Sequence, residues 1–223
     1  MPIVNPTFEY EAVFWEQGMT LIAGVDEVGA GCLAGPVVTS AVVLPHEVNI
    51  DKLRDSKTLS PAQREKIALQ IKEVAVAWAI GLSTPTEIDE INIRQADFLA
   101  MRRALAGLGV EYHVVLSDGF AIPGLTCHQQ AIIKGDQKSK SIAAASIVAK
   151  VYRDALMVEY EKEFPGYGFA QHKGYGTAEH CLALKNLGPC PIHRKSYAPV
   201  REAQARLCEP STIADNGRGA AIP

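Results

Sequence analysis

The sequence lacks three features that would place it in common protein classes. No apolar run is long enough to span a bilayer, which argues against an integral membrane protein. No Lys or Arg precedes Lys52, so the basic stretch that opens a secretory signal peptide is missing. None of the five cysteines stands in a Cys-x-x-Cys pair, which disfavours zinc ribbons and thioredoxin-like redox sites. We therefore expect a cytoplasmic protein whose cysteines are free thiols.

The chain also lacks the net positive charge that is typical of a nucleic-acid binder, since its formal net charge is −3. The charges are nevertheless unevenly distributed. Residues 1–51 contain seven acidic residues and no Lys or Arg, whereas residues 134–202 contain eleven Lys or Arg and seven acidic residues. This separation suits an enzyme that binds cations with carboxylates in one region and phosphates with basic loops in another. A chance fluctuation would give the same pattern.

The length of 223 residues suits one domain, or one domain with a small extension. Residues 209–223 are rich in small, polar, Pro and Gly residues and lack periodic apolar positions, which predicts a disordered tail. The folded domain is therefore expected to span residues 1–208. No internal repeat is visible in this range.

Strand and helix signals alternate along the domain. β-Branched and apolar runs predict strands at residues 21–28, 37–44, 76–82, 113–116 and 131–133. Apolar periodicity and helix-start signals predict helices at residues 60–74, 84–108, 141–160 and 177–187. Paired early strands followed by alternating helices and strands predict an α/β domain with a mixed sheet.

Four carboxylates stand at or just past the ends of predicted strands, namely Asp26, Glu27, Asp118 and Asp136. Sites in open sheets form at such strand ends. Adjacent carboxylates oppose each other's ionisation unless a cation neutralises them. Carboxylate oxygens suit Mg²⁺ or Mn²⁺, and two such ions can act together on a phosphoryl displacement. Spacing alone leaves a second interpretation open, in which Asp26 and Glu27 form an ordinary solvated surface pair.

A series of short motifs follows the order found in one nuclease family. The motifs are GVDEVG at 24–29, LAGPV at 33–37, DSK at 55–57, IDEINI at 88–93, DG at 118–119, KGD at 134–136, SIAAAS at 141–146, HKGYGT at 172–177 and IHRKS at 192–196. Together they resemble type 2 ribonuclease H (ribonuclease HII) over about residues 20–202. Each motif is weak alone, but the joint pattern is highly specific.

The resemblance implies a ribonuclease H-like mixed sheet flanked by helices, with a helical carboxyl-terminal extension. It implies an endonuclease that cuts the RNA strand of RNA–DNA hybrids and cuts 5′ to single ribonucleotides in duplex DNA. The four carboxylates would hold two divalent ions, Mg²⁺ or Mn²⁺. One ion would activate the attacking water, and the other would stabilise the leaving 3′-oxygen, which leaves 5′-phosphate and 3′-hydroxyl ends. The implied roles are primer removal in DNA replication and ribonucleotide excision repair, and a monomer is the default expectation.

The same resemblance assigns substrate contacts. Tyr175 matches the tyrosine that packs on the sugar of the deoxynucleotide after the ribonucleotide. Gly29 and Gly31 match the glycines whose backbone approaches the ribose 2′-hydroxyl, the group that separates RNA from DNA. Lys57 is expected to contact a phosphate. Basic residues near the carboxyl terminus are also favoured as substrate contacts over a solvated surface, namely Lys173 and the run His193-Arg194-Lys195.

The chain departs from the family in the glycine turn. The family turn reads Gly-Arg-Gly, but Ala30 here replaces the arginine that would face the substrate backbone. The next residue is Cys32, where proline is usual. Loss of one charged phosphate contact predicts weaker binding and a flatter salt dependence.

Two alternative functions have some support in the sequence. Residues 29–34 match the dinucleotide-binding pattern G-x-G-x-x-A, but Pro36 and the β-branched run that follows argue against the helix that this pattern requires. The second alternative is a protein that binds hybrids with weakened catalysis, which Ala30 favours and the complete set of four carboxylates disfavours. Metal dependence separates the two, since an enzyme needs Mg²⁺ or Mn²⁺ for turnover. His172 is expected to be structural rather than a proton carrier.

Overall fold

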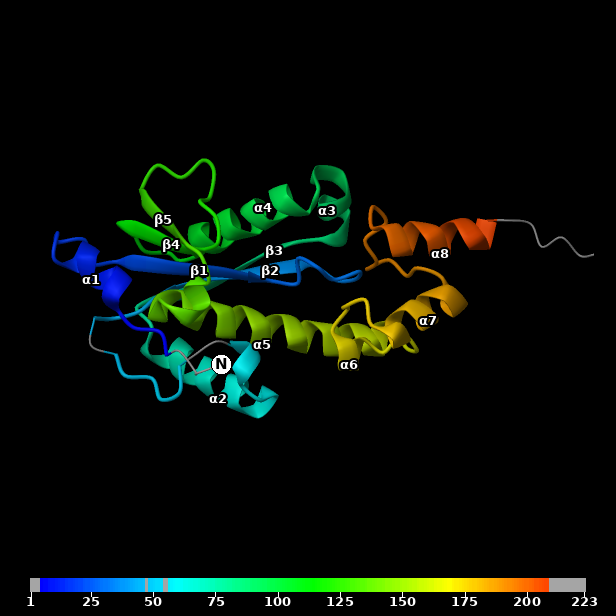
Figure 1. Ribbon diagram of the computed structural model, residues 1–223, viewed down its shortest axis with the longest axis horizontal. Coiled ribbons are helices and arrows are strands. Elements are labelled where there is room, and N and C mark those ends of the chain that lie inside the picture. Colours follow the sequence, from blue (N-terminus) through cyan, green and yellow to red (C-terminus); the bar gives the residue numbers. More distant parts are fainter. Residues whose placement is uncertain (1–4, 47, 54–55, 209–223) are drawn as a thin grey trace, which may run out of the picture.

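A computed structural model describes residues 5–46, 48–53 and 56–208 of the chain. Its centre is a five-stranded mixed sheet in the order β3-β2-β1-β4-β5 (Figure 1). The pairs β1–β2 and β2–β3 are antiparallel, whereas β1–β4 and β4–β5 are parallel, with Val25 opposite Ser117. The strands are β1 (Ile22–Val28), β2 (Val37–Val43), β3 (Ala77–Ser83), β4 (Val114–Asp118) and β5 (His128–Ile132). The predicted mixed sheet is confirmed, and the tail at 209–223 lies outside the described residues.

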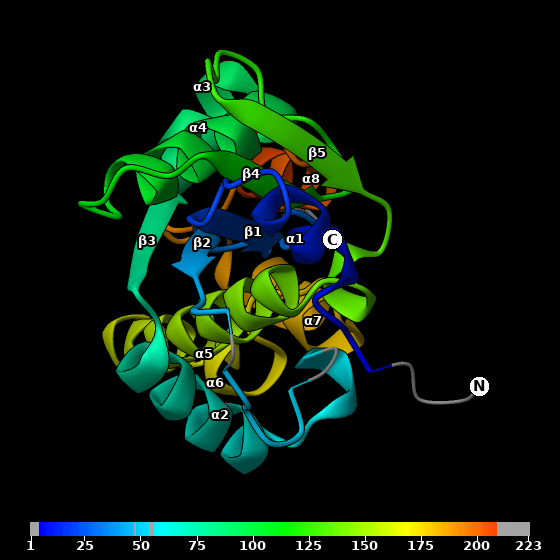
Figure 2. The same cartoon turned by 90° about the vertical axis from the view of Figure 1, so that its left-hand side faces the viewer.

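Helices cover both faces of the sheet. α4 packs on one face and α5 with α2 on the other, while α7 and α8 extend beyond one end (Figures 1 and 2). The helices are α1 (Glu9–Trp15), α2 (Pro61–Val74), α3 (Pro85–Ile91), α4 (Ile93–Ala106), α5 (Lys140–Glu163), α6 (Phe169–His172), α7 (Ala178–Leu187) and α8 (Ala198–Cys208). Two short 3₁₀ turns, η1 (Ser56–Thr58) and η2 (Gly135–Gln137), lie near the site described below. The helical carboxyl-terminal extension is therefore present in the described chain.

The single helix predicted over residues 84–108 is wrong, because the chain forms two helices there. Asn92 has φ 66°, which ends α3, and its side chain accepts a hydrogen bond from the Gln95 amide to begin α4. The buried residues Ile88 of α3 and Ala96 of α4 belong to one apolar cluster. The apolar periodicity therefore runs across the break and conceals it.

The predicted strand at residues 131–133 is displaced. β5 begins at His128, and three of its five residues are exposed because it is an edge strand. Its first three residues are polar, so the β-branched signal misses them. Lys134 then adopts a left-handed conformation, with φ 56°, and turns the chain into η2.

Close backbone contact fixes β1 against α5. A Cβ atom at Gly24 would lie 2.1 Å from the backbone carbon of Ser141, so only glycine permits this approach. The next turns of α5 present the fully buried residues Ala143, Ala144 and Ala145. Small side chains on both elements therefore place the end of β1 directly beside α5.

Two further expectations concern membranes and thiols. Within the described part of the chain, no helix combines the length and apolar character needed to cross a bilayer. The cysteines whose surroundings are described are free thiols, namely Cys32, Cys127, Cys181 and Cys190.

Candidate active site

Three aspartates converge where the parallel strands end. Asp26 lies near the end of β1, Asp118 ends β4, and Asp136 lies in η2 just after β5. Each offers a carboxylate oxygen, and these oxygens lie within 4.8 Å of one another. Asp26 and Asp136 are 5% and 2% exposed. The structure thus brings together three of the four carboxylates that the sequence singles out.

Backbone geometry sets the relation between Asp118 and Asp136. The Gly135 amide donates a hydrogen bond of 2.7 Å to Asp118 Oδ1, so the turn after β5 is tied to the end of β4. A Cβ atom at Gly135 would lie 2.6 Å from Cδ1 of Ile142. Glycine at this position therefore lets η2 sit between the sheet and α5.

Asp26 is held from two sides. Its Oδ1 accepts a hydrogen bond of 2.9 Å from the Glu27 amide, and its side chain hydrogen-bonds Ser146 of α5. Ser146 Oγ lies 3.0 Å from the Oγ atom of Ser56, the residue at which η1 begins. The next residue, Lys57, places its Nζ 3.3 Å from Asp136 Oδ2. The lysine for which the sequence predicts a phosphate contact thus lies against the carboxylate cluster.

The surroundings of the cluster disfavour the anionic form of two of its aspartates. Burial raises the pKa of Asp26 well above its ordinary value, and the charges of Glu27 and Asp118 raise it further. Burial also raises the pKa of Asp118, although the Gly135 amide opposes this shift. Because the anionic forms are disfavoured without a counter-charge, the donor set fits a bound divalent cation with a preference for oxygen ligands.

Glu27 lies outside the group of three, because alternate residues of a strand face opposite sides of the sheet. It lines a cavity of about 270 Å³ together with Ala30 and Asp97. Burial and the charges of Asp97 and Asp118 raise the pKa of Glu27 to about 7. Asp97 Oδ1 is buried without a hydrogen-bond partner, and burial raises the pKa of Asp97 to about 6. Sequence patterns do not indicate Asp97, whose only signal is an acid between the buried residues Ala96 and Phe98.

The two glycines of the turn have different surroundings. Gly29 has φ 94°, and a Cβ atom there would lie 2.2 Å from Nε of Arg153. Gly31 is exposed, and no atom lies within 4 Å of the position that its Cβ would take. Gly29 is therefore required by the fold, whereas Gly31 leaves open surface for an approaching ligand.

Two fully buried arginines hold this turn. Arg194 donates hydrogen bonds of 2.7 Å to the Gly29 carbonyl and 2.8 Å to the Ala30 carbonyl. Arg153 donates to the carbonyls of Pro36 and Lys173 over 3.0 and 2.8 Å. The expectation that Arg194 contacts substrate is wrong, since its guanidinium is buried against backbone oxygens. Sequence spacing cannot show this role, because the bonded carbonyls are distant along the chain.

Tyr175 lies against the same turn. The amide of Leu33 donates a hydrogen bond of 2.8 Å to the Gly174 carbonyl, and the Tyr175 hydroxyl is hydrogen-bonded to the Cys32 thiol. The ring is 41% exposed, and Lys150 Nζ lies 5.8 Å from its centroid. The predicted sugar-binding tyrosine and the predicted glycine turn are therefore adjacent.

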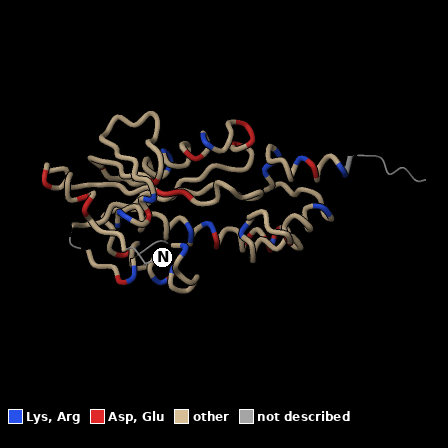
Figure 3. Tube along the Cα trace, in the orientation of Figure 1, with Lys and Arg blue, Asp and Glu red and all other residues tan. Residues whose placement is uncertain are grey.

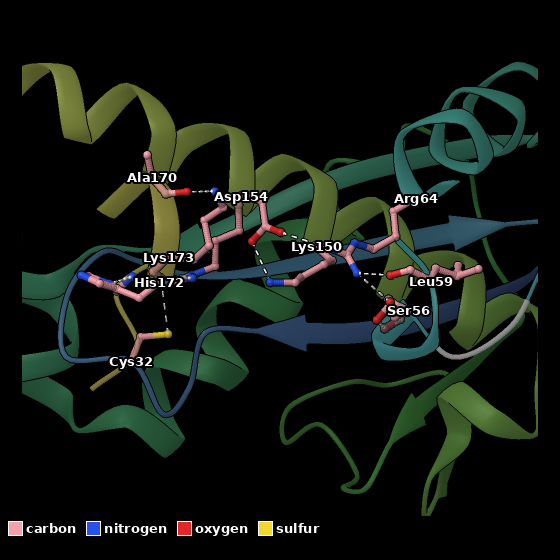
Figure 4. A network of polar contacts seen from close by, with 12 residues as sticks. Cys32, Ser56, Leu59, Arg64, Lys150, Asp154, Ala170, His172 and Lys173 are labelled. Atoms are coloured by element: carbon pink, nitrogen blue, oxygen red, sulfur yellow. Dashed lines mark hydrogen bonds and ion pairs between the residues drawn. The ribbon is translucent and has the colours of Figure 1, made fainter. Parts of the chain in front are cut away.

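A groove lined by both basic and acidic side chains runs along α5 near this tyrosine. Lys150 Nζ donates to Asp154 Oδ1 over 2.7 Å, and Arg64 Nη2 lies 3.8 Å from Asp154 Oδ2 (Figure 4). Arg64 also donates to the Ser56 carbonyl over 3.0 Å, which ties the groove to η1. Arg64, Lys150 and Lys173 line a cavity of about 590 Å³ together with the acidic residues Glu65 and Asp154. Acidic positions mark the end of β1, whereas α5 carries both basic and acidic positions (Figure 3).

Comparison with known proteins connects this geometry to one family. A family model described as Ribonuclease HII matches residues 23–200. A Ribonuclease HII of Synechococcus sp. (strain JA-3-3Ab) is 52% identical over 206 residues, which cover 91% of this chain and 93% of that protein. One from Nitrosococcus oceani is 54% identical over 180 residues, or 81% and 90% of the two chains. The crystal structure of the ribonuclease H2 from Pyrococcus horikoshii OT3 superimposes with a TM-score of 0.74 at 26% identity, covering 83% of this chain and 98% of that one.

Proposed function

The chain belongs to the ribonuclease HII family of metal-dependent endoribonucleases acting on RNA–DNA hybrids, and from this we propose that it also cuts duplex DNA 5′ to single embedded ribonucleotides. The observation that carries the proposal is the convergence of Asp26, Asp118 and Asp136 beside an open glycine turn and an exposed tyrosine. The products would carry 5′-phosphate and 3′-hydroxyl ends. The cytoplasmic location and the monomeric state stay predictions.

We assign the metal site to the four carboxylates. Asp26, Asp118 and Asp136 would hold two ions, Mg²⁺ or Mn²⁺, with Glu27 at the edge of the site. Bound there, the ions would supply positive charge for the attacking and leaving oxygens of the phosphoryl transfer. The chain itself orients the ligands, since the Gly135 amide fixes Asp118 and the Glu27 amide fixes Asp26.

Recognition of the ribonucleotide would come from the turn and the tyrosine. The open space over Gly31 admits the sugar edge that carries the 2′-hydroxyl. Tyr175, exposed beside this turn, would pack on the next sugar and favour a deoxyribose there. The groove lined by Arg64, Lys150 and Lys173 would lie along a phosphate backbone.

A hybrid-binding protein with weakened catalysis is the second candidate, and Ala30 is the observation that favours it. The alanine removes a charged side chain from the turn. The turn itself keeps its anchors, because Arg194 and Tyr197 both donate to the Ala30 carbonyl over 2.8 Å. This supports an intact catalytic centre with reduced substrate affinity.

The test uses a labelled DNA duplex that contains one ribonucleotide. The protein is incubated with it in Mg²⁺, in Mn²⁺ and in EDTA, beside Asp118→Asn and the exposed control Asp51→Asn. We expect a metal-dependent cut 5′ to the ribonucleotide, lost in Asp118→Asn and kept in Asp51→Asn. A duplex that is bound but uncut in either metal would support the binding-only candidate.

A further inference from the structure

Three histidines form a continuous chain beneath the Gly174–Tyr175 turn. The rings of His172 and His180 stack with centroids 4.3 Å apart, and His180 Nε2 lies 3.0 Å from His193 Nε2. His180 and His193 are 0% and 1% exposed. The residues come from the end of α6, the first turn of α7 and the segment after α7, so the fold brings them together.

The hydrogen-bond partners fix the tautomer of His180. Its Nδ1 lies 2.9 Å from the Tyr175 carbonyl oxygen, which can only accept. Nδ1 therefore carries the hydrogen, and in a neutral ring Nε2 is an acceptor. The His180 side chain thus holds the backbone of the tyrosine that the proposed function places on the substrate.

The partners of His193 fix its tautomer in turn. The Cys190 amide, which can only donate, lies 2.9 Å from His193 Nδ1, so Nδ1 carries no hydrogen. The hydrogen of His193 is then on Nε2 and points at His180 Nε2. A hydrogen on both Nε2 atoms would place two N–H groups against each other at 3.0 Å. The bond between the rings therefore runs in one direction, from His193 to His180.

His172 completes the arrangement. Its Nδ1 accepts a hydrogen bond of 3.1 Å from the Gly174 amide, and its Nε2 lies 2.7 Å from the Tyr167 carbonyl. All six ring nitrogens then have partners with three neutral rings. The three histidines together bind the Gly174 amide and the Tyr175 carbonyl. A histidine that only fills the core needs partners for its own ring nitrogens and does not need bonds to one particular turn.

We propose that His180 and His193 are positioning residues for Tyr175. His193 keeps His180 in the tautomer that donates to the Tyr175 carbonyl, and this bond fixes the tyrosine against the glycine turn. A hydrogen bond to one ring nitrogen commonly fixes the tautomer of a functional histidine in this way. The proposal rests on the proposed function, in which Tyr175 contacts the sugar after the ribonucleotide.

The first test reads the tautomers directly. Long-range ¹H–¹⁵N spectra of the ¹⁵N-labelled wild-type protein at neutral pH distinguish the two ring nitrogens of each histidine. We expect the Nδ1–H form for His180 and the Nε2–H form for His193. In His193→Asn, whose amide is too short to reach, only the Tyr175 carbonyl still favours the Nδ1–H form of His180, so the share of the Nε2–H form should rise. His193→Gln places an amide N–H near the original Nε2 and should restore the Nδ1–H form.

The second test asks whether His193 acts through Tyr175. On the single-ribonucleotide duplex, His193→Asn should lower kcat/KM about tenfold, the effect of one buried hydrogen bond, and His193→Gln should lower it less. His128→Asn, an exposed histidine on β5, is the matched control. The double variant Tyr175→Ala/His193→Asn should match Tyr175→Ala within about twofold, because residues that act as a unit do not add.

The outcomes separate the inference from the proposed function. An Nε2–H form of His180 in the wild-type protein overturns the inference, as do losses from the two substitutions that multiply. If His193→Asn fails to fold, the wild-type spectra and His193→Gln still show whether His193 sets the tautomer of His180. A wild-type protein that does not cut the duplex at all contradicts the proposed function, while the spectra continue to test the histidine chain.

Discussion

Arg194 Nη1 donates a hydrogen bond of 2.8 Å to the carbonyl oxygen of Ala30. The bond holds the backbone of residue 30 without using its side chain, which is partly exposed and lines the cavity beside Glu27. Position 30 can therefore change its side chain while the turn keeps its shape. The turn geometry and the phosphate contact that the family resemblance implies for an arginine there are thus separable.

The first prediction follows for Ala30→Arg. An added guanidinium should gain one phosphate contact, so KM should fall several-fold while kcat changes little. The salt dependence of binding should steepen by about one in the slope of log K against log salt. Steady-state kinetics and binding at four salt concentrations measure both. Unchanged KM and kcat would contradict the prediction.

The second prediction separates folding from substrate approach at two glycines. Gly24→Ala should destabilise the protein by about 3 kcal/mol or more, because the added methyl meets the backbone of α5. Gly31→Ala should leave stability within about 0.5 kcal/mol of the wild type, since its Cβ enters open space. Its activity should nevertheless fall at least about tenfold, because the methyl occupies the surface that the ribose would approach.

Urea unfolding and cleavage assays of both glycine variants give the comparison. Full activity of Gly31→Ala would remove this glycine from the proposed 2′-hydroxyl contact. Normal stability of Gly24→Ala would show that β1 and α5 can separate without cost.

The third prediction concerns acid stability. Burial, with the charges of His180 and His172, lowers the pKa of His193 from 6.5 to about 4. The unfolded chain binds this proton below about pH 6.5, and the folded chain only below about pH 4, so the free energy of unfolding falls as the pH drops through this window. The loss should approach about 3 kcal/mol and end near pH 4. His193 faces His180, Cys190 and the tilted rings of Tyr167 and Phe169, none of which is an anion that would oppose the shift.

The comparison is between the wild type and His193→Gln, by urea unfolding at pH 7 and pH 4.5. Carboxylates with raised pKa values, such as Asp26, act in the opposite direction, but they are the same in both proteins. The variant should therefore lose less stability than the wild type. An equal loss in both proteins would contradict the assigned cause.

The fourth prediction concerns the pH dependence of metal binding. Metal ions compete with protons for carboxylates, and burial raises the pKa values of Asp26 and Asp118, while the pKa of Glu27 at the edge of the proposed site is raised to about 7. Mn²⁺ should therefore raise the unfolding temperature more at pH 8 than at pH 6. Asp118→Asn should lose this stabilisation, and Asp51→Asn should keep it. Thermal unfolding with and without Mn²⁺ measures the difference, and equal stabilisation at both pH values would count against carboxylate ligation by this cluster.

The sequence predicts the sheet and the convergence of aspartates because both depend on local signals. Asp118 and Asp136 each follow a strand, and the ends of parallel strands meet at one edge. The direction of Glu27 and its neighbour Asp97 could not be predicted in the same way. They line one cavity between β1 and α4, and nothing in either segment encodes the distance between them.

The roles of Arg194 and His180 also escape the sequence. Both side chains bind backbone carbonyls. Every residue has a backbone carbonyl, so the sequence does not indicate which one is bound. The sequence around Arg194 suggests a phosphate contact, but its side chain donates hydrogen bonds to backbone carbonyls of the glycine turn. Asn92 shows the same limit for the fold, since its positive φ depends on helix packing that periodicity does not report.

The pairing of β1 with β4 has a consequence for how the protein reaches its native state. The segment from β1 through β3 carries Asp26 and Glu27, but Asp118 and Asp136 arrive only when β4 and β5 dock from far along the chain. Such long-range docking belongs to the late steps of folding. A slip of one residue between Val25 and Ser117 would also turn Asp118 toward the wrong face. Divalent ions can therefore bind and stabilise only the complete sheet in its correct register. They should slow unfolding and leave the rate of folding nearly unchanged.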